Sequence, residues 1–388
     1  MNPPTSAHVT TCNNVTAHTI APLSSVILKK VRDASFVAID LEFTGLGDKH
    51  PKDMNHRYMA MKKTVETHAI VSMGLSVIKK TPGQDDRYQS YVCDNFQFLT
   101  LKQGNFTVNT ETGKFLVKHH FSFDRLFTDG IPYDPAGQQT LHALWKGILA
   151  ALAEHRIPLV IHHGLYDLLY LYHSFIGPLP KTLQGFLKEF ADRFPSGVYD
   201  TKYLVELEGW DASFLSFVFA RCDRLRQDRY KQPTMERPYF EVRVQEPVEY
   251  IKEDKKRKSE GERDKGERKK RKETKSESYC KQYAERGYCE LDHAPDSPLH
   301  DIQIIMDHQM GPSDYPQVYT SSLVPTVKDP VEAIQGAHSA HFDAYMTGFA
   351  FCYLTHTMTP TQLENGKNKL KLRGLDIPLT FPTTPRIH

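Results

Sequence analysis

The chain has 388 residues, 39% hydrophobic and 25% charged, which suffices for one large core or for a core with a small appendage. A formal net charge of +2 provides no overall basic field, so nucleic-acid binding would depend on local charge. Six mostly scattered cysteines argue against a disulfide framework and favour a reducing compartment. We find no signal-peptide pattern and no apolar run of the roughly 18 residues that span a bilayer. We therefore expect a soluble intracellular protein that does not bind membranes.

Periodic apolar patterns predict the first elements of the chain after a flexible leader over residues 1–21. A Pro82-Gly83 turn joins two of the predicted strands as a hairpin. The strands are expected at 36–42, 70–79, 88–101 and 158–161, and the helices at 23–34, 57–67, 121–128, 141–155, 165–175, 183–194 and 212–225. Strands that alternate with helices, together with an antiparallel hairpin, predict an α/β layer fold with a mixed sheet.

The composition changes in the second half of the chain. Residues 252–275 are almost entirely charged or small and polar, which predicts a disordered basic linker, bounded here as 246–278. A compact Cys/His segment over 279–302 follows. Globular sequence resumes over 303–388, with a predicted helix at 333–355 and a terminal strand at 370–381. One domain, begun over residues 22–245, is therefore interrupted by the linker and the Cys/His segment.

The first strand ends in two acidic residues, Asp40 and Glu42. Side chains alternate along a strand, so both carboxylates project from the same face. Two like charges placed together repel unless a cation lies between them, and hard oxygen ligands suit Mg²⁺ or Mn²⁺. Taken alone, the pair is equally well explained as an exposed strand edge.

Two further acidic residues lie early on predicted helices. Asp167 follows a sheet strand, and Asp343 lies five residues after His338. Either one alone is an ordinary first-turn residue favoured by the helix dipole. The complete order D-x-E, D, H-x4-D is far more specific.

This pattern resembles the DEDD superfamily of 3′-to-5′ exonucleases, in the DEDDh branch and its deadenylase-like group. The first motif is Phe36-Val37-Ala38-Ile39-Asp40-Leu41-Glu42-Phe43-Thr44-Gly45. The segments 159–168, 194–203 and 338–348 resemble further motifs of the group. The resemblance implies a ribonuclease H-like fold, with a mixed sheet flanked by helices.

The resemblance also implies the catalytic roles. Asp40, Glu42, Asp167 and Asp343 would hold two Mg²⁺ ions (or Mn²⁺), and His338 would be the general base. Two such ions polarise the scissile phosphate, and a histidine near neutral pKa can accept the proton of the attacking water. The product would be a nucleoside 5′-monophosphate.

Four residues near these motifs have open roles. His163 either faces the sugar-phosphate or fills a turn, and Phe43 either stacks on a terminal base or packs in the core. Asp200 is either a carboxylate that supports the metal ligands or, more simply, a cap. His341 is a rival to His338, but the spacing of the family favours His338.

The Cys/His segment resembles a CCCH zinc finger that one member of the group carries between its second and third motifs. Cys280 and Cys289 fit its start and His300 its end, but the third cysteine is absent. His293 would complete a Cys₂His₂ zinc site, with Asp292 or Asp296 as other substitutes. The alternative is a degenerate loop without metal.

Two basic clusters in the linker, residues 255–258 and 268–272, match a bipartite nuclear-localisation pattern. They predict a nuclear protein and an import receptor as a partner, although the same charges suit RNA phosphates or a solvated linker.

The function implied is 3′-to-5′ exoribonuclease action on adenylated 3′ tails, within small nuclear RNA maturation. A general poly(A) mRNA deadenylase and a catalytically silent RNA-binding scaffold are the alternatives. The sequence leaves the tail sequence, the protein partners and the oligomeric state open, a homo-oligomer included.

Overall fold

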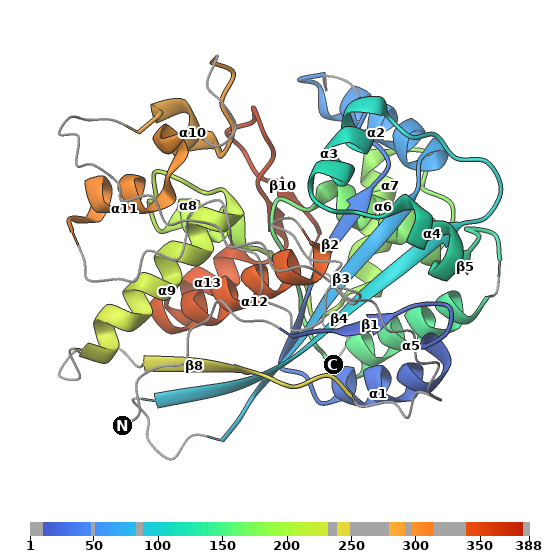
Figure 1. The fold of residues 1–388 in the computed structure, drawn as a ribbon, viewed down its shortest axis with the longest axis horizontal. Coiled ribbons are helices and arrows are strands. Elements are labelled where there is room, and N and C mark those ends of the chain that lie inside the picture. Colours follow the sequence, from blue (N-terminus) through green and yellow to red (C-terminus); the bar gives the residue numbers. More distant parts are fainter. Residues whose placement is uncertain are drawn as a thin grey trace, which may run out of the picture.

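A mixed sheet of eight strands forms the centre of the described chain (Figure 1). The computed structural model describes residues 11–47, 51–82, 88–137, 139–231, 239–248, 279–291, 297–312 and 339–382. The strands of this sheet are β1 (Asn13–Val15), β2 (Phe36–Phe43), β3 (Ile70–Lys80), β4 (Tyr88–Lys102), β5 (Ile131–Tyr133), β6 (Leu159–Ile161), β7 (Val198–Asp200) and β8 (Tyr239–Val244). Their order is β1-β4-β3-β2-β6-β7, and β5 and β8 also pair with β4.

Helices cover both faces of this sheet (Figure 1). The helices are α1 (Ile20–Arg32), α2 (Met54–Thr67), α3 (Thr110–Lys118), α4 (Phe123–Asp129), α5 (Thr140–Glu154), α6 (Leu165–Phe175), α7 (Leu183–Arg193), α8 (Thr201–Leu207), α9 (Leu215–Lys231), α10 (Lys281–Arg286), α11 (Ile302–Met310), α12 (Ala340–Thr357) and α13 (Pro360–Gly366), with a 3₁₀ turn at Pro298–His300. One apolar cluster contains side chains of α1, α5, α6 and α7, and a second contains those of α9 and α12. None of the described helices is long and apolar enough to cross a membrane.

The alternation of side chains along β2 explains the two clusters. Val37, Ile39 and Leu41 belong to the cluster with α1 and α5, whereas Phe36 and Ala38 belong to the cluster with α12. Positions 40 and 42 follow Phe36 and Ala38 at intervals of two residues. Their side chains therefore project on the same face of the sheet, which α12 covers. The acidic pair thus lies on the α12 side of the sheet.

The directions of the strands bring together the strand ends that carry the acidic motifs. β2 is antiparallel to β3 but parallel to β6, with Ala38 opposite Val160, and β6 is parallel to β7. The carboxyl ends of β2, β6 and β7 therefore meet at one edge of the sheet. The expected mixed α/β fold and the β3–β4 hairpin are both confirmed.

Three expected elements are wrong in the described residues. The flexible leader expected over 1–21 is wrong for residues 13–21, because β1 pairs with β4, Val15 is fully buried and α1 begins at Ile20, whereas residues 1–10 lie outside the described residues. The helix expected at 333–355 begins only at Ala340, since Ser339 is extended, and 333–338 lie outside the described residues. The single terminal strand is instead an antiparallel pair, β9 (Lys369–Leu370) and β10 (Leu379–Thr380), separated by Gly374 at φ +75°.

Several described elements were not expected from the sequence: strands β5, β7 and β8 and helices α3, α8, α10, α11 and α13. Helix α3 begins after Asn109, whose side chain accepts from the N–H groups of Glu111 and Thr112. Strand β8 pairs in parallel with β4, a partner distant in sequence that local periodicity does not reveal.

The segment after the linker packs on α9. Arg224 of α9 is 2% exposed and its Nη1 donates to Asp307 Oδ1 of α11 at 2.8 Å. The centroids of the Phe214 and Tyr283 rings are 5.5 Å apart. Ile305 and Met306 are fully buried in the second apolar cluster. The described parts of this segment are therefore joined to the α12 side of the domain; most of the expected linker, 249–278, lies outside the described residues.

Candidate active site

Three carboxylates from β2 and α12 converge at the edge of the sheet. Oxygen atoms of Asp40, Glu42 and Asp343 all lie within 4.8 Å of one another. The first two come from alternate positions of one strand, and the third comes from the first turn of the helix that packs on that strand. The cluster thus joins residues about 300 positions apart.

A glycine in β3 allows this approach. Gly74 pairs with Asp40 across the sheet, and a Cβ placed on it would lie 1.9 Å from the carbonyl oxygen of Ala340. Atoms at that distance overlap, so any side chain at position 74 would push the first turn of α12 away. The backbone contact between β3 and α12 therefore sets the position of Asp343.

Asp167 reaches β2 from α6, the helix that follows β6. Its Oδ1 accepts a hydrogen bond of 2.9 Å from the N–H of Leu41, the residue between Asp40 and Glu42. Asp167 lies in the first turn of α6, directly after β6. Burial raises the pKa of Asp167 to about 7, with smaller contributions from Asp200 and Asp343.

The carboxylates, of which Asp343 is buried and the others are partly buried, repel one another. Burial raises the pKa of Asp40 well above its usual value, and the charges of Asp343, Asp167 and Glu42 raise it further. Burial likewise raises the pKa of Glu42, again with Asp343 and Asp167. Such a set is costly as anions unless cations neutralise it. An all-oxygen set of this kind fits hard divalent ions such as Mg²⁺ or Mn²⁺.

A small pocket lies beside Glu42, with room for about one water molecule. Its walls combine the polar side chains of Ser72, Gln97, His119 and Ser339 with the apolar side chains of Leu116, Phe121 and Ala340. The space beside Glu42 is therefore small and mostly apolar.

Of the two candidate histidines, the structure describes only His341. His338, the expected general base, lies outside the described residues. His341 is fully buried, and its Nδ1 forms a hydrogen bond with Oε1 of Gln97 on β4. Burial lowers the pKa of His341 to about 4. A neutral ring held against the sheet agrees with the interpretation of His341 as a bystander.

Two of the three residues with an expected role toward substrate occupy structural positions. Phe43 is 8% exposed and its ring stacks on Tyr170 with centroids 4.2 Å apart, which is core packing. Asp200 is fully buried, and its carboxylate accepts from the N–H groups of His163, Lys202 and Lys371 at 2.8, 3.0 and 2.9 Å. Asp200 therefore caps α8 and also fixes the turn after β6.

His163 itself adopts φ +56° directly after β6. Although the residue is exposed, desolvation of its ring lowers the pKa of His163 to about 4, together with the nearby cations of Lys202, Arg57 and Arg373. The sequence analysis missed the two arginines. They lie 316 positions apart and meet only because Nη1 of Arg57 donates to the carbonyl of Arg373, at 2.9 Å.

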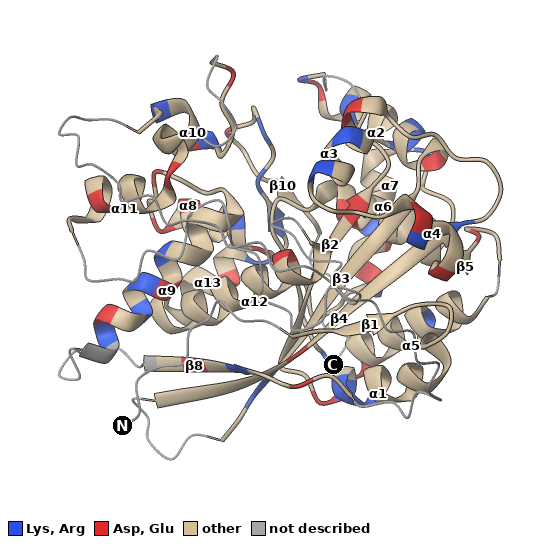
Figure 2. Cartoon of the chain, in the orientation of Figure 1, with Lys and Arg blue, Asp and Glu red and all other residues tan. Residues whose placement is uncertain are grey.

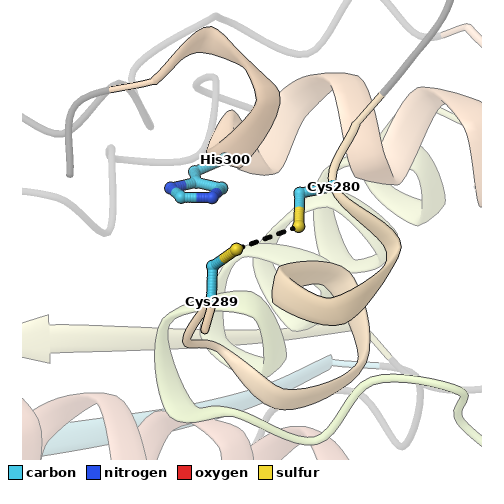
Figure 3. Close-up of side chains that lie close together, drawn as sticks. All are labelled: Cys280, Cys289 and His300. Atoms are coloured by element: carbon cyan, nitrogen blue, oxygen red, sulfur yellow. Dashed lines mark hydrogen bonds between the residues drawn. The ribbon is translucent and has the colours of Figure 1, made fainter. Parts of the chain in front are cut away.

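Cys280, Cys289 and His300 form a second cluster, which shares no residue with the carboxylate cluster. Their side chains lie close together in Figure 3. The two sulfur atoms are 3.4 Å apart, and ligand atoms of all three residues lie within 4.8 Å of one another. The His300 ring stacks on Tyr283 with centroids 4.2 Å apart. His293, Asp292 and Asp296 lie outside the described residues.

Acidic side chains of β2, α6 and α12 lie close together in this α/β fold, an arrangement suited to divalent cations. The chain belongs to the CAF1 family of ribonucleases, whose family model matches residues 15–144 and 138–351. This match confirms the expectation of a ribonuclease family.

Curated relatives are similar over part of the chain. Mouse poly(A)-specific ribonuclease PNLDC1 is 25% identical over 34% of this chain and 28% of its own length. The silkworm (Bombyx mori) pre-piRNA 3′-exonuclease trimmer is 26% identical over 46% of this chain and 32% of its own length. The matched region thus spans about a third of the length of these relatives. Among solved structures, the Mg²⁺- and Mn²⁺-bound form of S. pombe Pop2p has a TM-score of 0.40 and 20% identity, over 50% of this chain and 75% of Pop2p.

Proposed function

We propose that the protein is a Mg²⁺-dependent 3′-to-5′ exoribonuclease that removes adenylated 3′ tails and releases nucleoside 5′-monophosphates. The observation that supports this most strongly is the cluster of Asp40, Glu42 and Asp343, with Asp167 bonded to the same strand. Clustered, partly buried carboxylates whose charges raise one another's pKa have a ready explanation as ligands of divalent cations.

In this proposal the chain's own residues have distinct tasks. Asp40, Glu42, Asp167 and Asp343 would hold two divalent ions, and the N–H of Leu41 would keep Asp167 turned toward β2. Bound ions of this kind polarise a scissile phosphate and lower the pKa of water. His338 would accept the proton of the attacking water, which the family spacing favours over the buried His341.

The test uses RNA labelled at its 5′ end and carrying a 3′ oligo(A) tail. With Mg²⁺ or Mn²⁺ the wild-type protein should shorten it one nucleotide at a time, whereas the Asp40→Ala/Glu42→Ala variant should not. Asp192→Ala, an exposed acidic change on α7, is the matched control and should behave as wild type. Absence of shortening with retained RNA binding would favour the catalytically silent scaffold instead.

The RNA class is a finer proposal. We infer that the tails belong to small nuclear RNAs, because the inserted Cys/His segment makes the chain resemble the target of early growth response protein 1. General deadenylation of mRNA is the competing function, and PNLDC1 and the silkworm trimmer are relatives named for other substrates. Competition between a tailed small nuclear RNA and a poly(A) mRNA separates the two: preference for the mRNA would overturn the proposal.

The Cys/His cluster supports a second proposal, a zinc site. Two thiols and an imidazole within 4.8 Å are ligands that zinc favours, and His293 would supply the fourth. The N–H of Cys280 donates to the carbonyl of Leu299 at 2.8 Å, which joins the two ends of the segment. Metal analysis should find one zinc per chain, lost in Cys280→Ser/Cys289→Ser and retained in Cys12→Ser. A zinc-free wild type, or a Cys280–Cys289 disulfide, would contradict it.

We also propose a nuclear location, with import through the basic clusters 255–258 and 268–272, which lie outside the described residues. A fluorescent fusion should be nuclear, and replacement of both clusters by alanine should shift it to the cytoplasm. A fusion that remains nuclear after both replacements would refute the role of the clusters.

A further inference from the structure

Arg57 is a buried cation that has no carboxylate partner among the described residues. It lies on α2, is 8% exposed and donates from Nη1 to the Arg373 carbonyl. Its Nε is buried and has no hydrogen-bond partner among the described residues, and no described carboxylate lies within ion-pair distance of its guanidinium. Burial lowers the pKa of Arg57, with a smaller effect of Arg373 in the same direction. A desolvated guanidinium of this kind favours an anion from outside the protein.

Arg373 joins this position to the Cys/His segment. Its guanidinium carbon lies 4.4 Å from the centroid of the Tyr288 ring, and its Nη2 donates to the Tyr288 hydroxyl. The nearest described acid is Glu290, 3.8 Å away, and both side chains are 63% exposed. An exposed pair at that distance is weak and screened by salt, so a phosphate can replace it.

These side chains lie beside the carboxylate edge. Arg57 and Arg373 both lower the pKa of His163, which follows β6 four residues before Asp167. Arg57 also lies on α2, a helix that packs against α6, which carries Asp167. In Figure 2, Lys and Arg follow the C-terminal segment that contains β9 and β10, between α10 and α2. Lys369, Lys371 and Arg373 are the basic residues there.

A single-stranded RNA whose 3′ end reaches the carboxylates needs a path for its remaining nucleotides. Each nucleotide adds one phosphate charge, and single-strand channels pair cations with aromatic rings on which bases stack. Arg57, Arg373 and Tyr288 provide two guanidinium groups and one ring in a continuous line of contacts.

We propose that Arg57, Arg373 and Tyr288 form an RNA clamp for the nucleotides on the 5′ side of the scissile phosphate. The two arginines bind backbone phosphates, and Tyr288 stacks on a base. The clamp rests on the proposed function and extends it, because it makes the Cys/His segment part of the RNA-binding surface of the nuclease. The three are positioning residues and do not touch the reacting atoms.

The binding test uses a labelled 20-nucleotide oligo(A) and the Asp40→Asn/Glu42→Gln protein, so that cleavage does not interfere. Adding Arg373→Ala should weaken binding about tenfold and reduce the slope of log affinity against log salt by about 0.7, the value for one single-strand phosphate contact. Tyr288→Leu should weaken binding roughly tenfold without changing the slope, because it removes stacking and no charge. Arg32→Ala on α1, a basic change on another part of the domain, is the control.

The kinetic test separates the clamp from the carboxylate site. In the otherwise wild-type protein with Mg²⁺, Arg373→Ala should raise KM for the 20-mer and leave kcat and the hydrolysis of a dinucleotide unchanged. Arg57→Lys retains the positive charge but not the planar guanidinium group. It should raise KM for the 20-mer less than Arg57→Met does.

Each outcome decides between the hypotheses. If Arg373→Ala and Tyr288→Leu match Arg32→Ala in affinity, slope and KM, the clamp is refuted while the nuclease proposal survives. Equal losses on the dinucleotide and the 20-mer would also refute it, since these residues would then act on the fold or the carboxylates. If the wild-type protein cleaves neither RNA, the proposed function fails, and the binding arm still decides whether the clamp exists.

Discussion

The carboxylate of Asp167 and the main-chain N–H of Leu41 form a hydrogen bond of 2.9 Å across 126 positions of sequence. Leu41 lies between Asp40 and Glu42, so this bond connects α6 to the centre of the acidic strand. It places a third acidic side chain beside two others despite their mutual repulsion. One oxygen of Asp167 thus accepts a hydrogen bond that holds α6 to β2. The negative charge of the carboxylate remains available to bind a cation.

Two substitutions at Asp167 separate these tasks. Asp167→Asn retains an acceptor for the Leu41 N–H and removes the charge, so we expect near-normal stability with a loss of activity of at least about 100-fold. Asp167→Ala removes both, and should also lower the free energy of unfolding by about 1 kcal/mol. Tail-shortening rates and urea unfolding measure the two effects. An active Asp167→Asn protein would show that the charge is not needed.

Gly74→Ala should damage activity from outside the acidic cluster. The new methyl group would overlap the Ala340 carbonyl and displace the first turn of α12, which contains Asp343. We expect about 1–3 kcal/mol of destabilisation and a clear loss of tail shortening. Gly177→Ala, where nothing lies within 4 Å of the added Cβ, is the matched control. Normal activity of Gly74→Ala would mean that the position of α12 matters less than the geometry indicates.

The two histidines before Asp343 should respond differently. His338→Ala should lower kcat by about 100- to 10,000-fold with little effect on stability, as expected for a general base. His341→Leu leaves the Gln97 amide oxygen without its buried partner, and should cost about 1–3 kcal/mol of stability. Single-turnover rates and thermal unfolding distinguish the pair. The reverse pattern would exchange their roles.

Stability should fall as the pH falls below about 6.5. His356 of α12 stacks on Phe240 and bonds to the Tyr91 hydroxyl at 3.1 Å; burial, with Lys80 and Arg229, lowers its pKa to about 4. The unfolded chain takes up a proton near pH 6.5 and the folded protein only near pH 4, so the stabilisation is complete above 6.5 and disappears between these values.

The measurement is urea unfolding at pH 7 and pH 5. His356→Phe cannot titrate and should lose about 1–2 kcal/mol less than the wild type between these pH values. His163 and His173, whose pKa values are also lowered to about 4, remain in both proteins and leave a common slope. Identical pH dependence of the two proteins would show that His356 is protonated equally in both states.

The sequence by itself determined the fold class and most of the central elements. Helix α6 matches its expected span, and β2, β3 and β4 begin where alternation and the Pro82-Gly83 turn indicate. These elements are set by local apolar periodicity, which a single sequence carries. The same holds for Asp40 and Glu42, because two positions on one strand share a face whatever the partners are.

Only the tertiary structure decided which distant groups meet. The contact of Gly74 with Ala340, the hydrogen bonds of Asp200 with the N–H groups of His163 and Lys371, and the meeting of Arg57 with Arg373 all join residues far apart in sequence. The same applies to β1 and β8, whose strand character depends on pairing with β4. Such contacts are set by packing and hydrogen bonding between elements, and no local pattern encodes a partner that lies 37 or 316 residues away.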